Sequence, residues 1–502
     1  MLRFFAGLNV NQMLYPAAGV AVTRVERWIL VGLMALLAYP AWIRGGTYVP
    51  FQAPLLGLGA WVLVTVFLAP AVRRGDEPLG RVLGAQGRRL AGDPVFWLGL
   101  VFLGLLTVQW LNSGRQLVFD DSARRWMYTP PPVRALPSSI NRSEAGEMLV
   151  WFFPAWAAML ALRSGLLGRR AHLELFFFMA VNAGILALFG LVQRASGTRA
   201  IYWLQPMERY FFASFGYENH AGAFFVLMFA LSAGLLVRLL LRRGVRADRR
   251  RVATLSACAL LNLMAANLSL SRSAILVSWA MAGCVTVYFA ASAWRFLRPV
   301  QKLRLVVGGV GAVFLAAFLV AAVAWPAVSR EMSTLHSGEE SVNLVGGEWG
   351  LLRSAAFAMW KDHPWVGVGG WGFRFLLGWY VPPERWSEIR IGDASVHNDA
   401  LQFAAEFGVI GTGLIAAGVA VCLVPVIRSG QWRRPLVLIA LAGLGMTVLQ
   451  SMIDLPFRCP AVLYAWVVIL AGLSGVAANS VDNHAAGRDS GPAAGSRAGA
   501  VT

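Results

Sequence analysis

The chain of 502 residues is 58% hydrophobic and only 14% charged, with a mean hydropathy of +0.60. Soluble domains are about 45–50% apolar and about 25% charged, so this composition excludes an ordinary soluble protein and predicts a polytopic membrane protein. The 44 basic and 25 acidic residues give a formal charge of +19. In a membrane protein such an excess is first a signal of topology, and nucleic acid is not expected as a partner.

The N-terminal segment, residues 1–24, has no clean apolar core ahead of a small-residue cleavage site. It therefore predicts a retained cytoplasmic segment rather than a removed signal peptide. The cysteines are scattered, mostly in apolar runs, and show no C-x-x-C spacing, so they indicate neither a disulfide framework nor a metal site. They are Cys258, Cys284, Cys422 and Cys459.

Apolar runs follow one another along most of the chain, and a helix needs about 20 residues to cross a bilayer, so about twelve spans are expected. The runs are 25–43, 50–71, 95–111, 148–162, 172–193, 219–241, 252–270, 273–294, 303–325, 398–427, 436–453 and 460–478. We expect an all-α fold, in which residues 25–478 form a membrane helix bundle and 479–502 a disordered cytoplasmic tail.

Residues 252–294 are too long to be one helix. At 1.5 Å per residue they would run about 64 Å, roughly twice the hydrocarbon thickness of a bilayer. The chain must therefore turn inside the segment LSLSRSA, where Ser269, Ser271, Arg272 and Ser273 form a polar cluster. This turn places Arg272 at a membrane surface between two helices.

Arginines concentrate in short connections on one side of the expected bundle, which predicts that this side and both termini are cytoplasmic. The opposite, external side receives three longer loops, at about 112–147, 194–218 and 326–397. Only the last is long enough to hold structure of its own. Within it, Gly350–Lys361 predicts a helix that lies on the surface.

The segment DHPWVGVGGWGF follows this surface helix. Glycines at such density let the backbone approach a ligand closely or adopt strained angles. Aromatic side chains crowd residues 360–386. They are ordinarily membrane-interface residues, and they are equally suited to be platforms for sugar rings, an alternative that the sequence leaves open.

The segment Ser395–Gly413 runs from polar residues directly into an apolar helix. Asn398, Gln402 and Glu406 recur at i, i+4 and i+8, so they form one polar stripe on that helix. Ser395 is expected to cap its N-terminus. A carboxylate such as Glu406 inside a span is a functional hypothesis by default, although hydrogen bonding between helices explains it nearly as well.

His397 lies at the beginning of this helix. An isolated histidine at an interface is usually a hydrogen-bonded surface residue. An imidazole at a helix entry can also take a proton from a hydroxyl nucleophile near neutral pH, which makes His397 the candidate general base. His336 and His363 have weaker context and are not assigned a role.

Two arginines are expected on the same external side as His397. Arg272 is either an interface anchor or a guanidinium that grips a phosphate through two hydrogen bonds. Arg209 precedes a span that opens with Glu218, Asn219 and His220. Two arginines and a histidine converging on one site would suit a pyrophosphate and a nucleophile, and since no metal-ligand spacing is present, arginine would neutralise the charge.

Three blocks of the sequence resemble the O-antigen ligase / Wzy-type polymerase superfamily of bacterial polysaccharide enzymes. They are Arg209 with FGYENHAGAFF, LSLSRSA, and RSAAFAMWKDHPWVGVGGWGF leading to SVHNDALQFAAEFGVIGTG. The third is the most specific, since the family has a glycine-rich segment ending in phenylalanine ahead of His-Asn, a leucine, a glutamate and G-x-x-G. Its residues here are Gly367, Gly369, Gly370, Phe373, His397, Asn398, Leu401, Glu406, Gly408 and Gly411.

The resemblance covers residues from about 205 to 415 and implies a glycosyltransferase of the bacterial inner membrane whose active site faces the periplasm. The donor would be a glycan on undecaprenyl pyrophosphate. The acceptor would be a sugar hydroxyl, on lipid A-core for a ligase or on another lipid-linked glycan for a polymerase. Chain-length regulators or export proteins are further candidate partners, and neither a cofactor nor a metal is implied.

The resemblance also implies roles for particular residues. His397 would be the base or would orient the acceptor, and Arg272 and Arg209 would hold the pyrophosphate leaving group. The supporting residues would be Asn398, Glu406, Asn219 and His220.

Two other classes of protein are compatible with the composition. A lipid-linked glycan flippase or transporter would also have many spans and charges within them, but it should show internal repeats with broken helices, and no repeat is visible. A non-catalytic subunit of a polysaccharide assembly complex is the second alternative.

Overall fold

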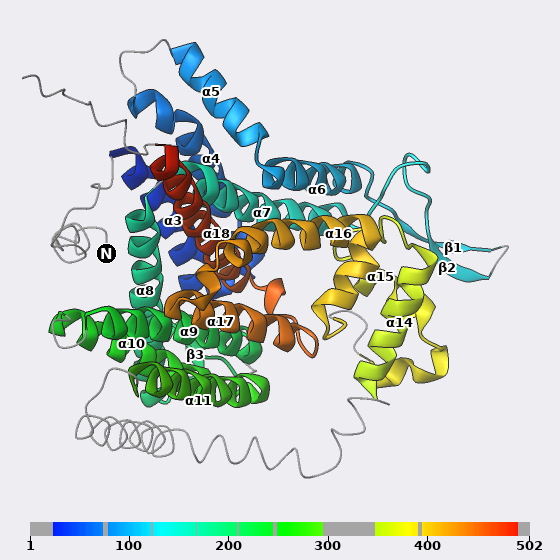
Figure 1. Ribbon diagram of the computed structural model, residues 1–502. Coiled ribbons are helices and arrows are strands. Elements are labelled where there is room, and N and C mark those ends of the chain that lie inside the picture. The colour runs from blue at the N-terminus through cyan, green and yellow to red at the C-terminus, as the bar shows by residue number, and fades with distance from the viewer. Residues whose placement is uncertain are drawn as a thin grey trace, which may run out of the picture.

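The computed structural model describes residues 24–73, 79–121, 124–166, 168–207, 210–243, 248–294, 347–389 and 394–489. This part of the chain is a bundle of helices with two short antiparallel hairpins (Figure 1). The expected all-α fold is confirmed.

The helices are α3 (Arg24–Trp42), α4 (Ala53–Arg73), α5 (Leu79–Ala91), α6 (Pro94–Leu111), α7 (Arg142–Leu160), α8 (Arg169–Ala195), α9 (Glu218–Arg243), α10 (Arg249–Leu268), α11 (Arg272–Trp294), α14 (Glu348–Asp362), α15 (Gly372–Tyr380), α16 (Asp399–Arg428), α17 (Pro435–Ser451) and α18 (Pro460–Asp489). Among the described residues, nine helices are long and apolar enough to cross a membrane. The spans expected at 25–43 and 436–453 correspond to α3 and the shorter α17, and the span expected at 303–325 lies outside the described residues. The protein is therefore a multi-pass membrane protein.

The turn expected inside 252–294 is confirmed. α10 ends at Leu268 and α11 begins at Arg272. Leu270 adopts a left-handed conformation with φ 60°, and serine hydroxyls bind the freed backbone groups on both sides. Ser269 Oγ donates to the carbonyl of Ala266 at 2.8 Å, and Ser271 Oγ accepts from the amide of Ala274 at 3.4 Å.

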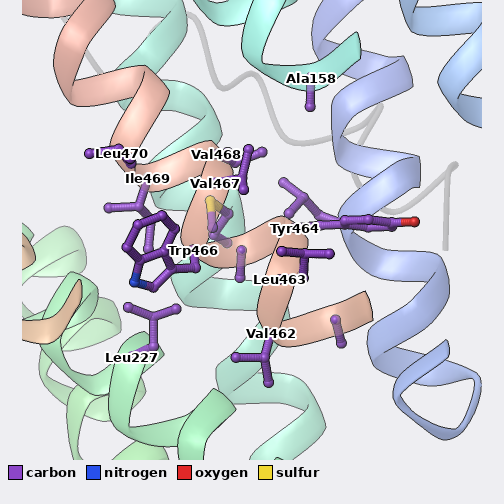
Figure 2. Packing of buried hydrophobic residues seen from close by; sticks show 14 of the residues in the cluster. Ala158, Leu227, Val462, Leu463, Tyr464, Trp466, Val467, Val468, Ile469 and Leu470 are labelled. Carbon is purple, nitrogen blue, oxygen red and sulfur yellow. The ribbon is translucent and has the colours of Figure 1, made fainter. Parts of the chain in front are cut away.

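The helix α18 forms the centre of the bundle. Its segment Pro460–Ala477 is entirely buried, as expected for a helix that is apolar on every side. The side chains of this segment pack against residues of surrounding helices, among them Ala158 of α7 and Leu227 of α9 (Figure 2). The connection between α17 and α18 leads into this enclosed helix. The packing of α18 therefore fixes the end of that connection.

Two kinds of element were not expected from the sequence. The arginine-rich segment after α4 forms the helix α5, in which Val82, Gln86 and Leu90 are buried at i, i+4 and i+8. The loops 112–147 and 194–218 contain the strand pairs β1 (Leu117–Asp120) with β2 (Arg125–Tyr128) and β3 (Ala200–Ile201) with β4 (Gln205–Pro206). Gly350–Lys361 was expected to be helical and lies within α14, which is confirmed.

The helix α16 is broken at Gly408, whose φ of 65° and ψ of −170° are not helical. The loop 364–370 occupies the break. The amides of Val409 and Ile410 donate to the carbonyls of Pro364 and Trp365 at 2.8 and 3.0 Å. In return, the amides of Val368 and Gly369 donate to the carbonyls of Ala405 and Glu406 at 3.0 and 2.8 Å.

Glycine is required on both sides of this contact. A Cβ at Gly367 would lie 2.3 Å from the carbonyl carbon of Glu406, and a Cβ at Gly408 would lie 2.3 Å from that of Trp365. The glycine-rich segment was expected to approach a ligand closely or to adopt strained angles. Its close approach here is to the backbone of α16, where it replaces helical hydrogen bonds that a membrane interior could not supply.

Candidate functional site

The site is built around the N-terminus of α16. Its N-cap is Asn398, whose Oδ1 accepts from the amide of Leu401 at 3.0 Å. The prediction that Ser395 caps this helix is therefore wrong by three residues. Ser395 and Asn398 are both favoured cap residues, and only the course of the backbone selects between them. His397 immediately precedes the cap and has a φ of 51°, an uncommon conformation for a residue with a side chain.

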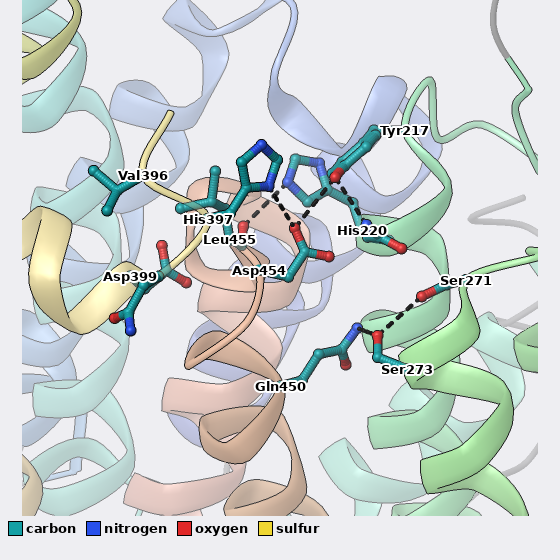
Figure 3. A network of polar contacts seen from close by, with 12 residues as sticks. Tyr217, His220, Ser271, Ser273, Val396, His397, Asp399, Gln450, Asp454 and Leu455 are labelled. Carbon is teal, nitrogen blue, oxygen red and sulfur yellow. Dashed lines mark hydrogen bonds and ion pairs between the residues drawn. The ribbon is translucent and has the colours of Figure 1, made fainter. Parts of the chain in front are cut away.

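Three contacts hold His397 in this conformation. Its ring stacks on Trp349 of α14, with centroids 4.8 Å apart and an interplanar angle of 16°. Its carbonyl accepts from Arg353 Nη2 at 3.1 Å. Its Nδ1 lies 3.8 Å from Oδ1 of Asp454, and the two side chains are 24% and 5% exposed. The ring is thus half-buried against a nearly buried carboxylate (Figure 3).

Asp454 belongs to a short segment, residues 452–459, which we call the α17–α18 connector. Its backbone binds two elements of the site. The carbonyl of Met452 accepts from Asn398 Nδ2 at 3.1 Å and from Arg353 Nη2 at 3.5 Å. The carbonyl of Leu455 lies 3.2 Å from Nε2 of His220. The connector therefore ties the beginning of α16 to the beginning of α9.

The beginning of α9 contributes the other partners of Asp454. The hydroxyl of Tyr217 donates to Asp454 Oδ1 at 3.2 Å and accepts from Asn219 Nδ2 at 2.8 Å. The rings of Tyr217 and His220 contact edge to face at 4.8 Å. Burial raises the pKa of Tyr217 well above its ordinary value, and the charges of Asp454 and Glu218 raise it further, so the hydroxyl keeps its proton.

We call His397, Trp349, Asp454, Tyr217 and His220 the His397 cluster. Asn219 and His220 were expected to be supporting residues. His220 is part of the cluster and contacts the connector, and Asn219 contacts the cluster through Tyr217. The facing carboxylate, Asp454, was not expected. The signal that could have found it is an aspartate in a short connection between two apolar runs, in the sequence SMIDLPFRCP.

Arg272 begins α11 and is half-buried. The neighbouring Ser273 Oγ accepts from Gln450 Nε2 at 3.0 Å and lies 3.2 Å from Ser271 Oγ. Gln450 stands near the end of α17, immediately ahead of the connector, so the turn that carries Arg272 lies on the same side of the bundle as Asp454 (Figure 3). Arg209, the second expected phosphate ligand, lies outside the described residues, as does His336.

Glu406 is fully buried and forms an ion pair with Arg458 of the connector at 2.5 Å. Gln402 donates to Glu406 Oε1 at 3.0 Å and accepts from the amide of Val396 at 3.1 Å. The polar stripe of α16 therefore faces the connector and braces the segment next to His397. The buried partner Arg458 was not expected from the sequence.

The guanidinium of Arg458 also lies 4.3 Å from the ring centroid of Trp371 and 5.6 Å from that of Phe403. Next to it, Asp399 is buried and accepts from the amide of Phe457 at 2.9 Å. Every acidic side chain of the first two turns of α16 thus has a partner in the connector. His363, in contrast, is exposed at the end of α14 and does not join the cluster.

An imidazole beside a buried carboxylate is an arrangement that can accept a proton from a hydroxyl group. The distance of 3.8 Å between His397 Nδ1 and Asp454 Oδ1 is too long for a hydrogen bond and allows an ion pair when the imidazole is protonated. Within the described part of the chain, no group of three or more His, Cys, Asp or Glu side chains is placed to hold a metal ion.

Fold and site together define a multi-pass, all-α membrane protein with a histidine–carboxylate pair at a helix entry. Residues 257–416 match the family described as O-Antigen ligase. For this stretch the match supports the O-antigen ligase / Wzy superfamily and, at the level of the family, a membrane glycan ligase or polymerase. No curated protein matches the chain.

The matched stretch contains Arg272, the loop 364–370, His397 and Glu406. Tyr217, His220 and the α17–α18 connector lie outside it. The site as the structure assembles it therefore combines residues of the matched stretch with partners from two other parts of the chain.

Proposed function

We propose that the protein transfers a glycan from undecaprenyl pyrophosphate to an acceptor sugar hydroxyl at the periplasmic face of the inner membrane, as an O-antigen ligase or a polysaccharide polymerase. The observation that carries this proposal is the pairing of His397 with Asp454 at the N-terminus of α16, on the side of the bundle where the turn of Arg272 lies. The family match supports the same class of reaction.

In the proposed reaction, His397 takes the proton of the acceptor hydroxyl. The acceptor oxygen forms a bond to the anomeric carbon of the donor, and the bond from that carbon to the pyrophosphate oxygen breaks. Asp454 orients the imidazole and stabilises its protonated form. Arg272, with Arg209, stabilises the charge that develops on the departing undecaprenyl pyrophosphate.

The hydrogen bonds around the connector support this assignment of roles. Asp454 accepts from Tyr217, and the segments on either side of it are bound to Asn398 and His220. A base that must act in one orientation benefits from such support, because a small displacement of a catalytic group costs a large part of the rate. Asn398, Asn219, His220 and Glu406 act in this proposal as positioning residues.

Replacement of His397 tests the proposal. We expect His397→Ala to abolish the surface polysaccharide and to lower transfer by purified protein by a factor of about 10²–10⁴, the usual contribution of a general base. His363→Ala is the matched control, since His363 is an exposed histidine of the same external region. Normal polymer from His397→Ala at a normal protein level would contradict the role of His397.

Replacement of Arg272 tests the phosphate-binding role separately. A lysine keeps the charge but loses the planar fork that binds two phosphate oxygens together, so Arg272→Lys should transfer poorly. Arg250→Lys, an exposed arginine near the opposite end of α10, is the control. Full activity in Arg272→Lys would remove the bidentate contact from the proposal.

One observation favours the second candidate, a lipid-linked glycan flippase. Discontinuous helices are typical of transporters, and α16 is discontinuous at Gly408. The two functions differ in their need for a bilayer. Purified protein in detergent that joins a lipid-linked glycan to an acceptor is an enzyme, whereas a flippase or a non-catalytic subunit forms no product there.

The acceptor decides between ligase and polymerase. In the same detergent assay, lipid A-core and a second lipid-linked glycan can be supplied in turn. Product only with lipid A-core identifies a ligase, and product only with the lipid-linked glycan identifies a polymerase. Adding a chain-length regulator then tests whether a partner sets the length of the product.

A further inference from the structure

A cavity of about 590 Å³ lies where α8 ends, between the last turns of this helix and the loop that follows. A volume of several hundred Å³ is typical of small-molecule sites. The polar and charged side chains that line it are Gln193, Arg194, Thr198, Arg199 and Tyr210. None of them belongs to the His397 cluster.

The cavity is cationic. The guanidinium of Arg194 donates to the hydroxyl of Tyr210 at 2.9 Å and lies 5.1 Å from the centroid of its ring. Burial raises the pKa of Tyr210 to about 12, so the hydroxyl stays protonated. Arg199 is exposed, and no carboxylate of the described residues forms an ion pair with it. This surface therefore favours a ligand with an anionic group.

Gln193, which lines the cavity, carries a buried acceptor without a donor. Gln193 is 1% exposed, and its Nε2 donates to the carbonyl of Ala200 at 3.1 Å. Its Oε1 has no hydrogen-bond partner among the described residues. A buried acceptor is stabilised by a donor. A carboxylate or a fully ionised phosphate supplies only acceptors, so the ligand must carry hydroxyl or amide hydrogens beside its charge.

We propose that this cavity binds an acidic saccharide unit, with its anionic group on Arg194 and Arg199 and a hydroxyl group on Gln193. The lining also includes the aromatic residues Tyr210 and Phe211. The choice of a saccharide rests on the proposed function, whereas the requirement for a hydroxylated anion rests on the cavity.

The cavity is joined to the turn of Arg272. The hydroxyl of Tyr210 donates to the carbonyl of Leu268, the last residue of α10. A saccharide bound in the cavity would therefore lie on an element that is directly attached to the phosphate-binding turn. The cavity would hold a unit of the glycan other than the one that reacts, and it would select glycans with acidic units.

Direct binding tests the proposal on the full-length protein in detergent, in the wild type and in His397→Ala. Isothermal titration calorimetry would compare a disaccharide that contains glucuronic acid, a neutral disaccharide of the same size, and inorganic phosphate. We expect the acidic disaccharide to bind at least tenfold more tightly than the neutral one. Arg199→Gln should weaken its binding about tenfold, the effect of one charge-assisted contact.

Two further variants sharpen the comparison. Gln193→Leu removes the buried acceptor and should weaken the acidic disaccharide without creating affinity for phosphate. Arg250→Gln removes an exposed arginine outside the cavity and should change nothing. Equal affinity for acidic and neutral disaccharides, binding of phosphate alone, or full binding in Arg199→Gln would each overturn the proposal.

Failure of this inference and failure of the proposed function give different results. If the protein transfers glycan but binds no acidic disaccharide, the cavity proposal alone is wrong. If the acidic disaccharide binds in the cavity while His397→Ala still makes polymer, the role of His397 is wrong and the cavity proposal stands.

Discussion

The Nδ1 atom of His397 lies 3.8 Å from Oδ1 of Asp454, although the two residues belong to different connections of the bundle. His397 precedes α16, and Asp454 lies between α17 and α18. Because α18 is enclosed by the bundle, the connector cannot move without disturbing buried side chains. The carboxylate of Asp454 is therefore held in place by the packing of α18, which lies away from the His397 ring.

Asp454→Asn should lower transfer by a factor of about 10² with little change in protein level. Asparagine keeps the size of the side chain and can still accept from Tyr217, but it removes the charge that stabilises a protonated imidazole. Transfer rates of purified protein over a range of acceptor concentrations give the measurement, and the loss should fall on kcat. Asp362→Asn, on the exposed end of α14, is the control. An unchanged kcat would show that Asp454 only supports the fold.

Tyr217→Phe should lower transfer about tenfold, since Asp454 loses a hydrogen bond worth about 1–2 kcal/mol. The raised pKa of Tyr217 means that its hydroxyl still carries the proton at and above the ordinary pKa of tyrosine, near 10. The ratio of wild-type to variant activity should therefore be constant from about pH 7 to about pH 10.5, where a tyrosine of ordinary pKa would have lost most of its proton. A ratio that falls toward 1 across this range would mean that the hydroxyl ionises and is not the donor to Asp454.

Arg458→Met should destabilise the protein by about 3–5 kcal/mol, because it leaves the buried carboxylate of Glu406 without its cation. The double variant Glu406→Leu with Arg458→Met should recover most of this loss, since no uncompensated charge remains. Thermal unfolding in detergent measures both. Equal melting temperatures of the single and double variants would argue against a buried ion pair.

Gly408→Ala should prevent accumulation of folded protein. Its φ and ψ lie in a region that is essentially restricted to glycine, which costs about 1–3 kcal/mol for any other residue. The added Cβ would also lie 2.3 Å from backbone of the loop 364–370. Gly413→Ala, in the same helix and with no atom within 4 Å of the added Cβ, is the control. It should be tolerated or slightly stabilising, and equal behaviour of the two variants would contradict the described break.

Much of the fold follows from local properties of the sequence. The turn between α10 and α11 could be located because one helix of that length exceeds the thickness of a bilayer and only one polar cluster interrupts it. The helix α5 was not predicted from the sequence, although Val82, Gln86 and Leu90 have helical spacing, because the arginines of this segment indicate topology rather than a helix. The sequence could not show that Asn398 rather than Ser395 caps α16. Both residue types are favoured at a cap, and the choice depends on the course of the preceding backbone.

The site could be predicted only in part, because local sequence does not show which helix ends meet. His397 stands out locally, as a polar residue at the entry of an apolar helix. Asp454 and Arg458 have no such local context, since their importance depends on which helix ends meet. The glycines of the loop 364–370 were expected to let the backbone approach a ligand or adopt strained angles, and the structure shows that they approach the backbone of α16.

The sequence by itself determined the membrane class, the positions of most spans, the family resemblance and the choice of His397. These depend on hydropathy, length and residue type, which are properties of short segments. Only the tertiary structure decided that Asp454 faces His397, that Glu406 pairs with Arg458, and that the loop 364–370 completes a broken helix. The physical reason is that a buried polar group requires a partner, but the helix that supplies this partner is selected by packing of the whole bundle.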